Sequence, residues 1–460
     1  MQFKRKKNNF VKLVFLMVSI LILGGVGFIY LSPAFEQNKP FIHAQNQLYW
    51  NIKSPIQVKV EDQSGIKYYK VSFRDGQKET VLLEKVFSDV QKEITIAIPP
   101  PKLDIFYKGV ETSLIIEVVD NSKWNFLEGN KGLKKVDLII DSRKPKANVL
   151  SNSRYIQRGG SAAVVVKVSD ENLKDAYISF NEKKRFELVP FYKEGYYMAL
   201  VAWPIDFEQF QRVNLVAVDK ADNITITKVP FYIQSKKIRT DNIELSNKFI
   251  NNVSASVLEQ SGEMVPQAPK EIFIASNKDL RAKNIQALEK VTRDALKEQS
   301  VNEVNIKPFK RLRGSKTVAG YGERRHYYLD GEKINEAWHL GIDWASVKKA
   351  PVYVSNAGDV VFNNYLGLYG NTIIVDHGMG LASLYAHTSS QSVEVGQQIN
   401  RGDKIARTGS TGAVFGDHLH FGILIQGVEV NPIEWMDGFW IKTRITDILK
   451  DGKKQIDERS

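Results

Sequence analysis

The pattern of hydrophobic and polar positions divides the chain into segments with different periodicities. An uncharged apolar run covers residues 13–31. Residues 40–235 carry short stretches of alternating apolar and polar positions, broken by Gly, Asp and Asn, which is typical of short antiparallel strands. Residues 236–309 are polar and mixed in charge, and apolar, β-prone runs such as residues 418–425 return afterwards. The pattern predicts a mainly β chain that begins with an apolar helix.

The apolar run is predicted to be a membrane anchor. Its 19 residues are about the length that crosses ~30 Å of hydrocarbon as a helix. A cleaved signal peptide is the competing interpretation, but its apolar core is usually ~7–15 residues long, and Pro33 makes the Ser32–Ala34 stretch a poor cleavage site. The preceding residues contain five basic side chains and no acidic one, which favours the cytoplasm. We therefore expect residues 1–12 to be a cytoplasmic tail and 13–31 a single span of the inner (cytoplasmic) membrane. The rest would lie on the periplasmic, extracytoplasmic side.

Residues 40–235 contain an internal repeat with a period of ~100 residues, about one β-sandwich. The motifs Val58–Asp62 and Ile66–Phe73 recur as Val166–Asp170 and Leu173–Phe180. The segment Asp141–Pro145 is the expected joint. The repeat predicts two sandwich domains, at 40–145 and 146–235. Both resemble bacterial immunoglobulin-like (Ig-like) domains, and this likeness implies a spacer or docking role by analogy alone.

Composition narrows the possible functions. The length of 460 residues predicts about three domains, and the net charge of +12 includes five positive charges from residues 1–12. We find no nucleic-acid-binding motif and no compact basic stripe, so nucleic acid is not an expected partner. The remaining surplus of positive charge is attributed to a solvated surface rather than to contact with an anionic cell wall. The chain has no cysteine, which excludes disulfides and a closed thiolate zinc site.

Histidines cluster near the C-terminus, where five of the seven lie between residues 339 and 420. His339, Asp343 and His420 have the spacing of metal ligands and leave a fourth position for water, as in a catalytic zinc site. Residues 418–425 follow a turn-rich segment and are predicted to form a strand, on which positions two apart share a face. His418 and His420 would then point the same way. His418 and His387 would be left to move protons.

Each histidine motif is weak by itself, because an isolated HxH or HxxxD is usually a pair of half-buried polar residues. Together, however, they resemble one family. His339–Ala345 is similar to the HxGxDxA box of the lysostaphin-like (LytM-type) zinc metallopeptidases that cut peptidoglycan cross-bridges. The resemblance covers residues 310–440 and includes further matching segments: Gly320–Arg325, Gly370–Gly378, Leu384–His387, Val395–Gly396, Gly402, Thr408–Gly412 and His418–Phe421.

The resemblance implies a C-terminal antiparallel β-sheet peptidase domain at 310–440. It makes His339, Asp343 and His420 the Zn²⁺ ligands, and His387 and His418 the catalytic histidines. His377 precedes the Gly378–Gly380 turn and is given a structural role. The sequence departs from the family pattern at Thr388, at Phe415–Asp417 and at Gly422, which puts the substrate preference in doubt rather than metal binding.

The implied function is a membrane-anchored zinc metalloendopeptidase that hydrolyses peptide cross-links of peptidoglycan. The main alternative is a catalytically inactive relative that binds and activates another cell-wall hydrolase, and a further one is a zinc peptidase for proteins or extended peptides. Inactive relatives typically lose metal ligands, and this chain keeps the set. A protein partner that regulates access to the site is also considered.

Residues 236–309 are predicted to be a partly helical linker. Ser276–Asp279 has the pattern of a capping box, and apolar positions at Ile285, Leu288 and Leu296 continue at helical spacing. An amphipathic helix needs a surface to cover. It can pack on the side of the peptidase domain, or it or a sandwich can occlude the substrate groove until a partner moves it. The charged tail, 441–460, is expected to fray.

Overall fold

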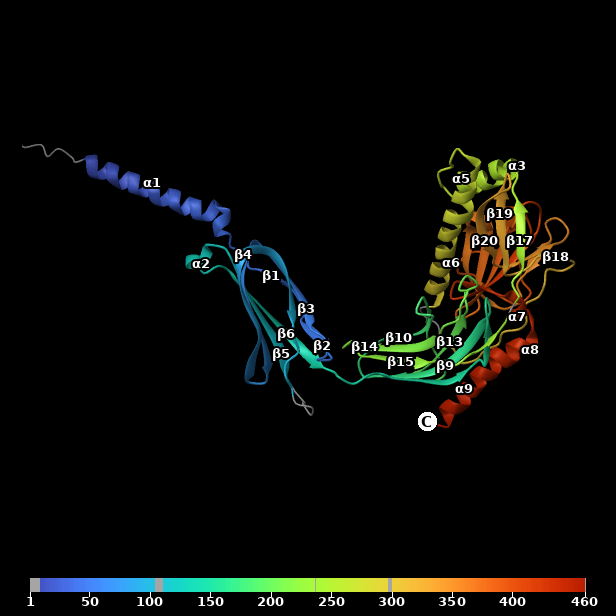
Figure 1. Cartoon of the computed structure of the whole chain (residues 1–460), viewed down its shortest axis with the longest axis horizontal. Coiled ribbons are helices and arrows are strands. Elements are labelled where there is room, and N and C mark those ends of the chain that lie inside the picture. The colour runs from blue at the N-terminus through green and yellow to red at the C-terminus, as the bar shows by residue number, and fades with distance from the viewer. Residues whose placement is uncertain (1–8, 104–110, 236, 297–299, 460) are drawn as a thin grey trace, which may run out of the picture. The chain divides into compact units, whose positions relative to one another are not determined.

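A computed structural model describes residues 9–103, 111–235, 237–296 and 300–459 (Figure 1). The described chain is mainly β, with several sheets and fewer helices, as the sequence predicts. It folds as two compact units, residues 1–144 with 219–223, and residues 145–218 with 224–460. Most of the predicted cytoplasmic tail lies outside the described residues.

The first unit begins with an apolar helix and continues as a sheet. The helix, α1 (Asn9–Leu31), is long and apolar enough to cross a membrane by length and composition, and its side chains are almost all exposed. The strands form one six-stranded sheet around a core that includes Val60, Val71 and Ile116. The elements after α1 are η1 (Pro33–Phe35), β1 (Phe41–His43), β2 (Gln47–Trp50), β3 (Ile56–Asp75), β4 (Lys78–Ile98), β5 (Thr112–Asp120), α2 (Trp124–Leu127) and β6 (Lys131–Ile140).

The internal repeat is present in the strands, but the two copies pair differently. In the first copy both repeated motifs lie on the single long strand β3, whose register shifts between Glu61 and Ile66. In the second copy the same motifs form two strands in two different sheets, β9 (Ser161–Ser169) and β10 (Leu173–Phe180). Because β3 continues across this register shift, the first copy forms one connected sheet. The sequence predicts a sandwich of two sheets. The likeness to Ig-like domains stays a prediction.

The second unit opens with the second copy of the repeat. Its two four-stranded sheets have the strand orders β12-β13-β9-β7 and β11-β10-β14-β15, and both contribute buried residues to one core. The remaining strands of this region are β7 (Lys146–Asn152), β8 (Tyr155–Gln157), β11 (Lys184–Glu187), β12 (Val189–Pro190), β13 (Tyr196–Ala202), β14 (Val213–Asp219), β15 (Ile224–Lys228) and β16 (Tyr232–Gln234).

The linker is partly helical, as predicted, and it packs on the peptidase region. Its strand β17 (Thr240–Glu244) pairs in parallel with β19 (Glu323–Leu329), and its helices share a buried cluster with Tyr327 and Ala337. The predicted cap at Ser276 is wrong, because this residue lies inside a helix that begins at Pro269, and its hydroxyl donates to the Phe273 carbonyl. The helical elements are α3 (Asn247–Phe249), η2 (Ile250–Ser254), α4 (Ala255–Gln260), α5 (Pro269–Ile274), η3 (Ala275–Leu280) and α6 (Arg281–Leu296).

An eight-stranded sheet is the scaffold of the C-terminal region. Its order is β18-β21-β29-β25-β24-β23-β27, with β30 paired to β29, so β29 lies between β21 and β25. Two three-stranded sheets, β17-β19-β20 and β22-β28-β26, flank it. The elements are β18 (Lys316–Ala319), β20 (Glu332–His339), β21 (Ile342–Ala345), β22 (Pro351–Tyr353), β23 (Gly358–Tyr365), η4 (Gly367–Tyr369), β24 (Asn371–Asp376), β25 (Leu381–Ala386), β26 (Ser390–Gln391), β27 (Gln398–Ile399), β28 (Lys404–Arg407), β29 (Leu419–Ile425), β30 (Val428–Val430) and α7 (Pro432–Met436).

The C-terminal residues are ordered helices, so the expectation of a frayed tail after Trp440 is wrong. The elements α8 (Gly438–Ile441), η5 (Lys442–Thr446) and α9 (Asp447–Asp457) follow one another. Ile445, Leu449 and Ile456 are buried in the core shared with the second copy of the repeat. A Cβ at Gly452 would lie 2.8 Å from the Val165 side chain, so the helix approaches β9 closely. The last helix therefore joins the peptidase region to the preceding sheets.

Candidate metal and catalytic centre

Strand register places two of the predicted metal ligands side by side. β21 and β29 are antiparallel neighbours, and Asp343 is directly opposite His420. Cross-strand partners project to the same face of a sheet. On the other face, the rings of Trp344 and Phe421 stack with their centroids 5.0 Å apart and hold the two strands together. These two apolar residues, each of which follows a predicted ligand in the sequence, thus form part of the layer that supports the site.

The third predicted ligand, His339, lies at the end of β20. His339 is the last residue of that strand, and the turn through Leu340 and Gly341 leads directly into β21. This turn brings Nε2 of His339 to 3.0 Å from Oδ2 of Asp343. A glycine is needed in the turn, because a Cβ at Gly341 would lie 2.4 Å from Nε2 of His420. The glycine of the HxGxD pattern therefore has a packing reason in this chain.

The three side chains converge as a metal site requires. Nδ1 of His420 lies 2.8 Å from Oδ1 of Asp343, and the three ligand atoms all lie within 4.8 Å of one another. Bonds of ~2.0–2.2 Å to a shared zinc ion would place ligand atoms roughly 3 Å apart. Nδ1 of His339 is 2.7 Å from the Gly320 carbonyl, which can only accept, so the neutral ring keeps its lone pair on Nε2. The residues present fit zinc.

Burial and charge also suit a cation. Burial raises the pKa of Asp343, but the contacts of this carboxyl with His339 and His420 outweigh it and hold that pKa well below its usual range. Burial lowers the pKa of His420. The site therefore presents an ionised carboxylate and a neutral imidazole, which are the forms that bind metal. Nε2 of His420 is buried and has no hydrogen-bond partner among the described residues.

The two predicted catalytic histidines lie beside the ligands. Nε2 of His418 is 3.8 Å from Oδ1 of Asp343, and the rings of His387 and His418 are 4.9 Å apart between centroids. Nδ1 of His418 faces the Gly416 carbonyl at 3.0 Å, and Nδ1 of His387 faces the Thr411 carbonyl at 2.8 Å. A neutral ring at either position would therefore carry its proton on Nδ1 and its lone pair on Nε2. Burial, together with the neighbouring His420 and His418, lowers the pKa of His387 to about 3.

His377 makes contacts that suit the structural role predicted for it. Its Nδ1 is 2.8 Å from the Ala357 carbonyl and its Nε2 is 2.7 Å from the Ser383 hydroxyl, so neither nitrogen is free to bind a ligand. Asp417, which departs from the family pattern, also has a structural explanation. Its carboxylate accepts hydrogen bonds from the Thr408 hydroxyl at 2.5 Å and from the Lys349 N–H at 3.0 Å. These bonds fix the loop that precedes His418.

The sequence analysis missed a buried pair behind the metal site. The Tyr369 hydroxyl donates to both carboxylate oxygens of Glu429, at 2.8 and 2.9 Å, and the Tyr369 ring meets the edge of the His420 ring at 5.7 Å between centroids. Burial raises the pKa of Glu429 to about 7. Tyr369 and Glu429 stand 60 positions apart, and no local pattern connects them.

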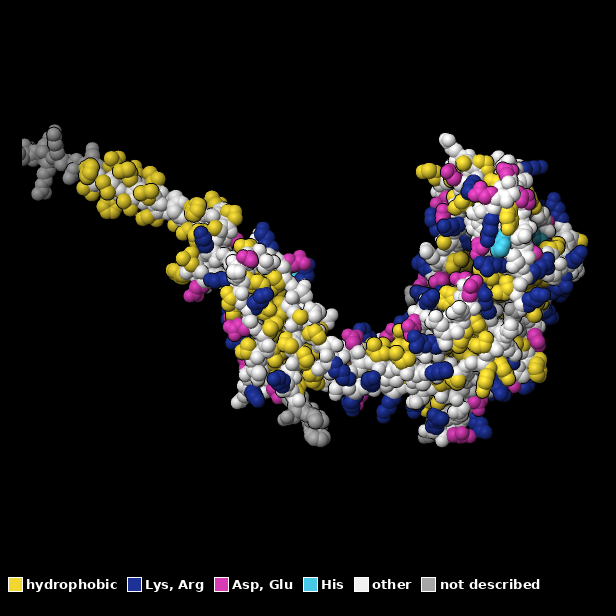
Figure 2. Space-filling model, in the orientation of Figure 1, with side chains coloured by type: hydrophobic (Ala, Val, Ile, Leu, Met, Phe, Trp, Pro, Cys, Tyr) yellow, Lys and Arg dark blue, Asp and Glu magenta, His cyan; other side chains and the backbone are white. Residues whose placement is uncertain are grey.

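The structure also brings basic residues together into one basic surface, which the sequence analysis did not identify. Lys310, Arg311, Arg313 and Arg401 line a cavity of about 240 Å³ that has no acidic lining residue. Dark blue Lys and Arg side chains gather along the right-hand edge of Figure 2, near β18 in Figure 1. This surface could not be predicted from local sequence patterns, because its residues come from segments almost 100 positions apart.

Comparisons with known proteins agree with the geometry. Residues 337–432 match peptidase family M23, so the C-terminal region contains a peptidase M23 domain and the resemblance to the lysostaphin-like family is confirmed. One relative, the "DD-carboxypeptidase/endopeptidase Mpg" of Neisseria meningitidis, is 36% identical over 129 residues, which are 28% of this chain and 28% of that protein. The chain thus matches little more than a quarter of that relative.

Two further comparisons match a similar share of the chain. The "Murein hydrolase activator NlpD" of Salmonella dublin is 38% identical over 103 residues, 22% of this chain and 27% of that protein. The catalytic domain of the antimicrobial peptidase lysostaphin from Staphylococcus simulans is 26% identical, with 27% of this chain and 94% of that domain covered and a TM-score of 0.24. The matched relatives therefore include both a named peptidase and a named activator.

Proposed function

We propose that the peptidase M23 domain of this chain is an active zinc endopeptidase that hydrolyses peptide cross-links of peptidoglycan. The observation that carries the proposal is the convergence of His339, Asp343 and His420, with His387 and His418 beside them. When bound, zinc lowers the pKa of a water toward ~7 and polarises the scissile carbonyl. The substrate class is supported by the M23 match and by relatives named for peptidoglycan and murein chemistry.

The histidine tautomers suggest which residue moves the proton. His418 presents the lone pair of Nε2 within 4 Å of the Asp343 carboxylate, so it can accept a proton from a water held at the ligands. His387 also presents a lone pair, and its pKa of about 3 keeps the ring neutral at pH 7. A neutral ring in this tautomer cannot donate from Nε2 to an oxyanion. His387 can therefore act on an oxyanion or on the leaving amine only after it has itself accepted a proton.

The membrane location is part of the same proposal. The helix α1 would hold the chain in the cytoplasmic membrane, with the peptidase domain on the periplasmic, extracytoplasmic side where peptidoglycan lies. The basic surface around Lys310 and Arg313 would suit an anionic wall polymer. The two copies of the repeat would act as spacers.

A regulatory role is the second candidate, because one matched relative is named an activator of murein hydrolases. The complete set of ligands and proton-transfer histidines argues against it. The two functions are separated by incubating purified peptidoglycan with the full-length protein and with a His418→Ala variant, followed by mass spectrometry of the soluble products. If the protein is an endopeptidase, the wild type releases un-cross-linked muropeptides and the His418→Ala variant does not. If it is a regulator, neither the wild type nor the variant releases muropeptides by itself.

A further inference from the structure

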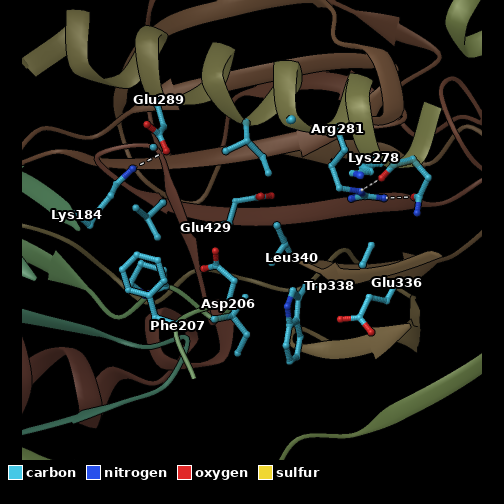
Figure 3. Close-up of a pocket in the computed structure, with 18 residues that line it drawn as sticks. Lys184, Asp206, Phe207, Lys278, Arg281, Glu289, Glu336, Trp338, Leu340 and Glu429 are labelled. Atoms are coloured by element: carbon cyan, nitrogen blue, oxygen red, sulfur yellow. Dashed lines mark hydrogen bonds and ion pairs between the residues drawn. The ribbon is translucent and has the colours of Figure 1, made fainter. Parts of the chain in front are cut away.

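A cavity of about 400 Å³ lies behind the metal site, within the second unit. It is bounded by α6, by the segment that follows β13, by β20 and by β30 (Figure 3). Its volume falls in the range of small-molecule pockets, ~300–1,000 Å³. Nothing in the catalytic arrangement requires this space, and the M23 match alone does not include the residues on α6 and after β13 that form two of its sides.

The middle of the cavity is apolar. Trp338 and Leu340 lie there, on either side of His339 in the sequence, and Phe207 covers the wall opposite α6. Trp338 and Leu340 are partly exposed, whereas His339 is buried toward the metal site. An aliphatic side chain of a ligand could therefore be covered by this part of the cavity.

Carboxylates stand on one side of this apolar middle. In Figure 3, Asp206 and Glu429 lie to the left of Leu340 and Trp338. Asp206 is exposed and forms no hydrogen bond or ion pair with another described residue, although the guanidinium of Arg158 is near enough to interact with it electrostatically. The neighbouring Lys184 is already paired with Glu289 at 2.5 Å, so it does not neutralise Asp206. This side can accept hydrogen bonds from a cationic group.

Donors stand on the other side. Glu336 also lies there, but its carboxylate is already paired with Arg324 at 2.8 Å and with Lys333 at 2.7 Å. Lys278 and Arg281 lie to the right of Leu340 in Figure 3. Lys278 is exposed and, within the described parts of the chain, unpaired. Arg281 donates to the carbonyl and to Oδ1 of Asn277, which fixes that side chain. Asn277 lines the cavity, and its buried Nδ2 has no hydrogen-bond partner in the described structure. A buried donor without an acceptor is costly, and a carboxylate ligand would satisfy it.

From this arrangement we infer that the cavity binds a short zwitterionic peptide. Its ammonium group would lie toward Asp206 and Glu429, and its carboxylate toward Lys278 and Asn277. An apolar side chain would lie against Leu340, because the guanidinium groups of Arg158 and Arg324 already lie over the Trp338 ring, 5.1 and 5.6 Å from its centroid. Charge-assisted contacts at both ends would select free termini over blocked ones. The site is separate from the metal ligands, so its occupancy does not depend on the proposed catalytic activity.

The test is calorimetric titration of the full-length protein in detergent with Ala-Leu-Ala, in the presence of a chelator that removes binding at the metal centre. The free tripeptide should bind saturably. N-acetylation or C-amidation should each weaken binding about tenfold or more, the value of one charged hydrogen bond. Asp206→Asn should weaken binding of the free peptide by the same factor but leave the N-acetylated peptide unaffected. Lys278→Gln should weaken binding of the free peptide by the same factor but leave the affinity for the C-amidated peptide unchanged.

Matched controls come from exposed residues of the linker helix that do not line the cavity. Asp279→Asn and Lys283→Gln should leave the affinity unchanged. All four variants change exposed side chains, so their thermal unfolding midpoints should match that of the wild type. Equal affinity for free and blocked peptides, equal behaviour of cavity and control variants, or no saturable binding would each overturn the inference.

Discussion

Replacement of Gly341 by alanine tests how closely the metal site is packed. The added Cβ would lie 2.4 Å from Nε2 and 2.6 Å from Cε1 of His420, and 2.6 Å from the carbonyl oxygen of Phe421. To restore an ordinary van der Waals distance, the added Cβ and Nε2 of His420 must move apart by about 1 Å. The Phe421 backbone is held between β21 and β25. The imidazole of His420 is therefore the group that must move.

The size of this movement decides the outcome. Metal–ligand distances tolerate about ±0.2 Å, so a shift of about 1 Å removes His420 as a ligand. Loss of contacts that only orient a ligand costs ~10–100-fold in metal affinity, and displacement of the ligand itself should cost at least as much. Overpacking should also lower the free energy of unfolding by about 1–3 kcal/mol. We expect a folded protein that has lost zinc and hydrolysis together.

The assay measures bound zinc by mass spectrometry after dialysis, together with release of muropeptides and thermal unfolding. Gly422→Ala is the matched control on β29, because its Cβ would meet the nearest atom, Cβ of Leu384, at 3.4 Å. The control should keep zinc and activity. Wild-type zinc affinity in the Gly341→Ala protein would show that His420 is not packed against this turn and would refute the reasoning.

Three further predictions concern the catalytic base, a buried acid and the C-terminal helix. His418→Ala should retain zinc and lose ~10²–10⁴-fold in hydrolysis rate, as muropeptide release would show; an unchanged rate would remove its role as base. The pKa of Glu429 is raised to about 7, above its unfolded value, so its destabilising effect should grow as pH rises from about 4.5 to 7. Glu429→Gln should therefore leave stability similar near pH 4 and gain up to about 3 kcal/mol at pH 8 in denaturant unfolding, and no pH-dependent difference would contradict the buried acid. Leu449→Ala should cost about 2–5 kcal/mol, because the side chain is only 3% exposed, whereas a frayed tail would give no change.

The convergence of His339, Asp343 and His420 is the feature of the structure that sequence patterns predict best. The HxH spacing places His420 on β29 and His418 immediately before it, in an isolated bridge with Gly409, so the strand begins one residue later than predicted. The register of β21 with β29 brings Asp343 opposite His420. The tautomers depend on backbone carbonyls of Gly320, Gly416 and Thr411, which lie in loops with no sequence signature. The sequence therefore predicts which side chains converge, but not the orientation of each imidazole.

The errors have physical causes. In the C-terminal segment, many charged residues conceal apolar positions at Ile441, Ile445, Leu449 and Ile456, which fall on one helical face and are all buried. The many charged residues suggested a frayed tail, although the spacing of the apolar residues already indicated an amphipathic helix. Ser276 matched a capping pattern, yet tertiary packing extends the helix through it from Pro269. The basic surface and the cavity behind the metal site are assembled from distant segments, which local patterns cannot join.

The most direct test of the account is digestion of purified peptidoglycan by the full-length protein, with bound zinc measured in the same samples. We predict that the wild type carries about one zinc per chain and releases un-cross-linked muropeptides. Chelation should abolish release, added zinc should restore it, and His339→Ala and Asp343→Ala should lose both metal and activity. Release of the same products by metal-free protein, or by either ligand variant, would contradict the central claim.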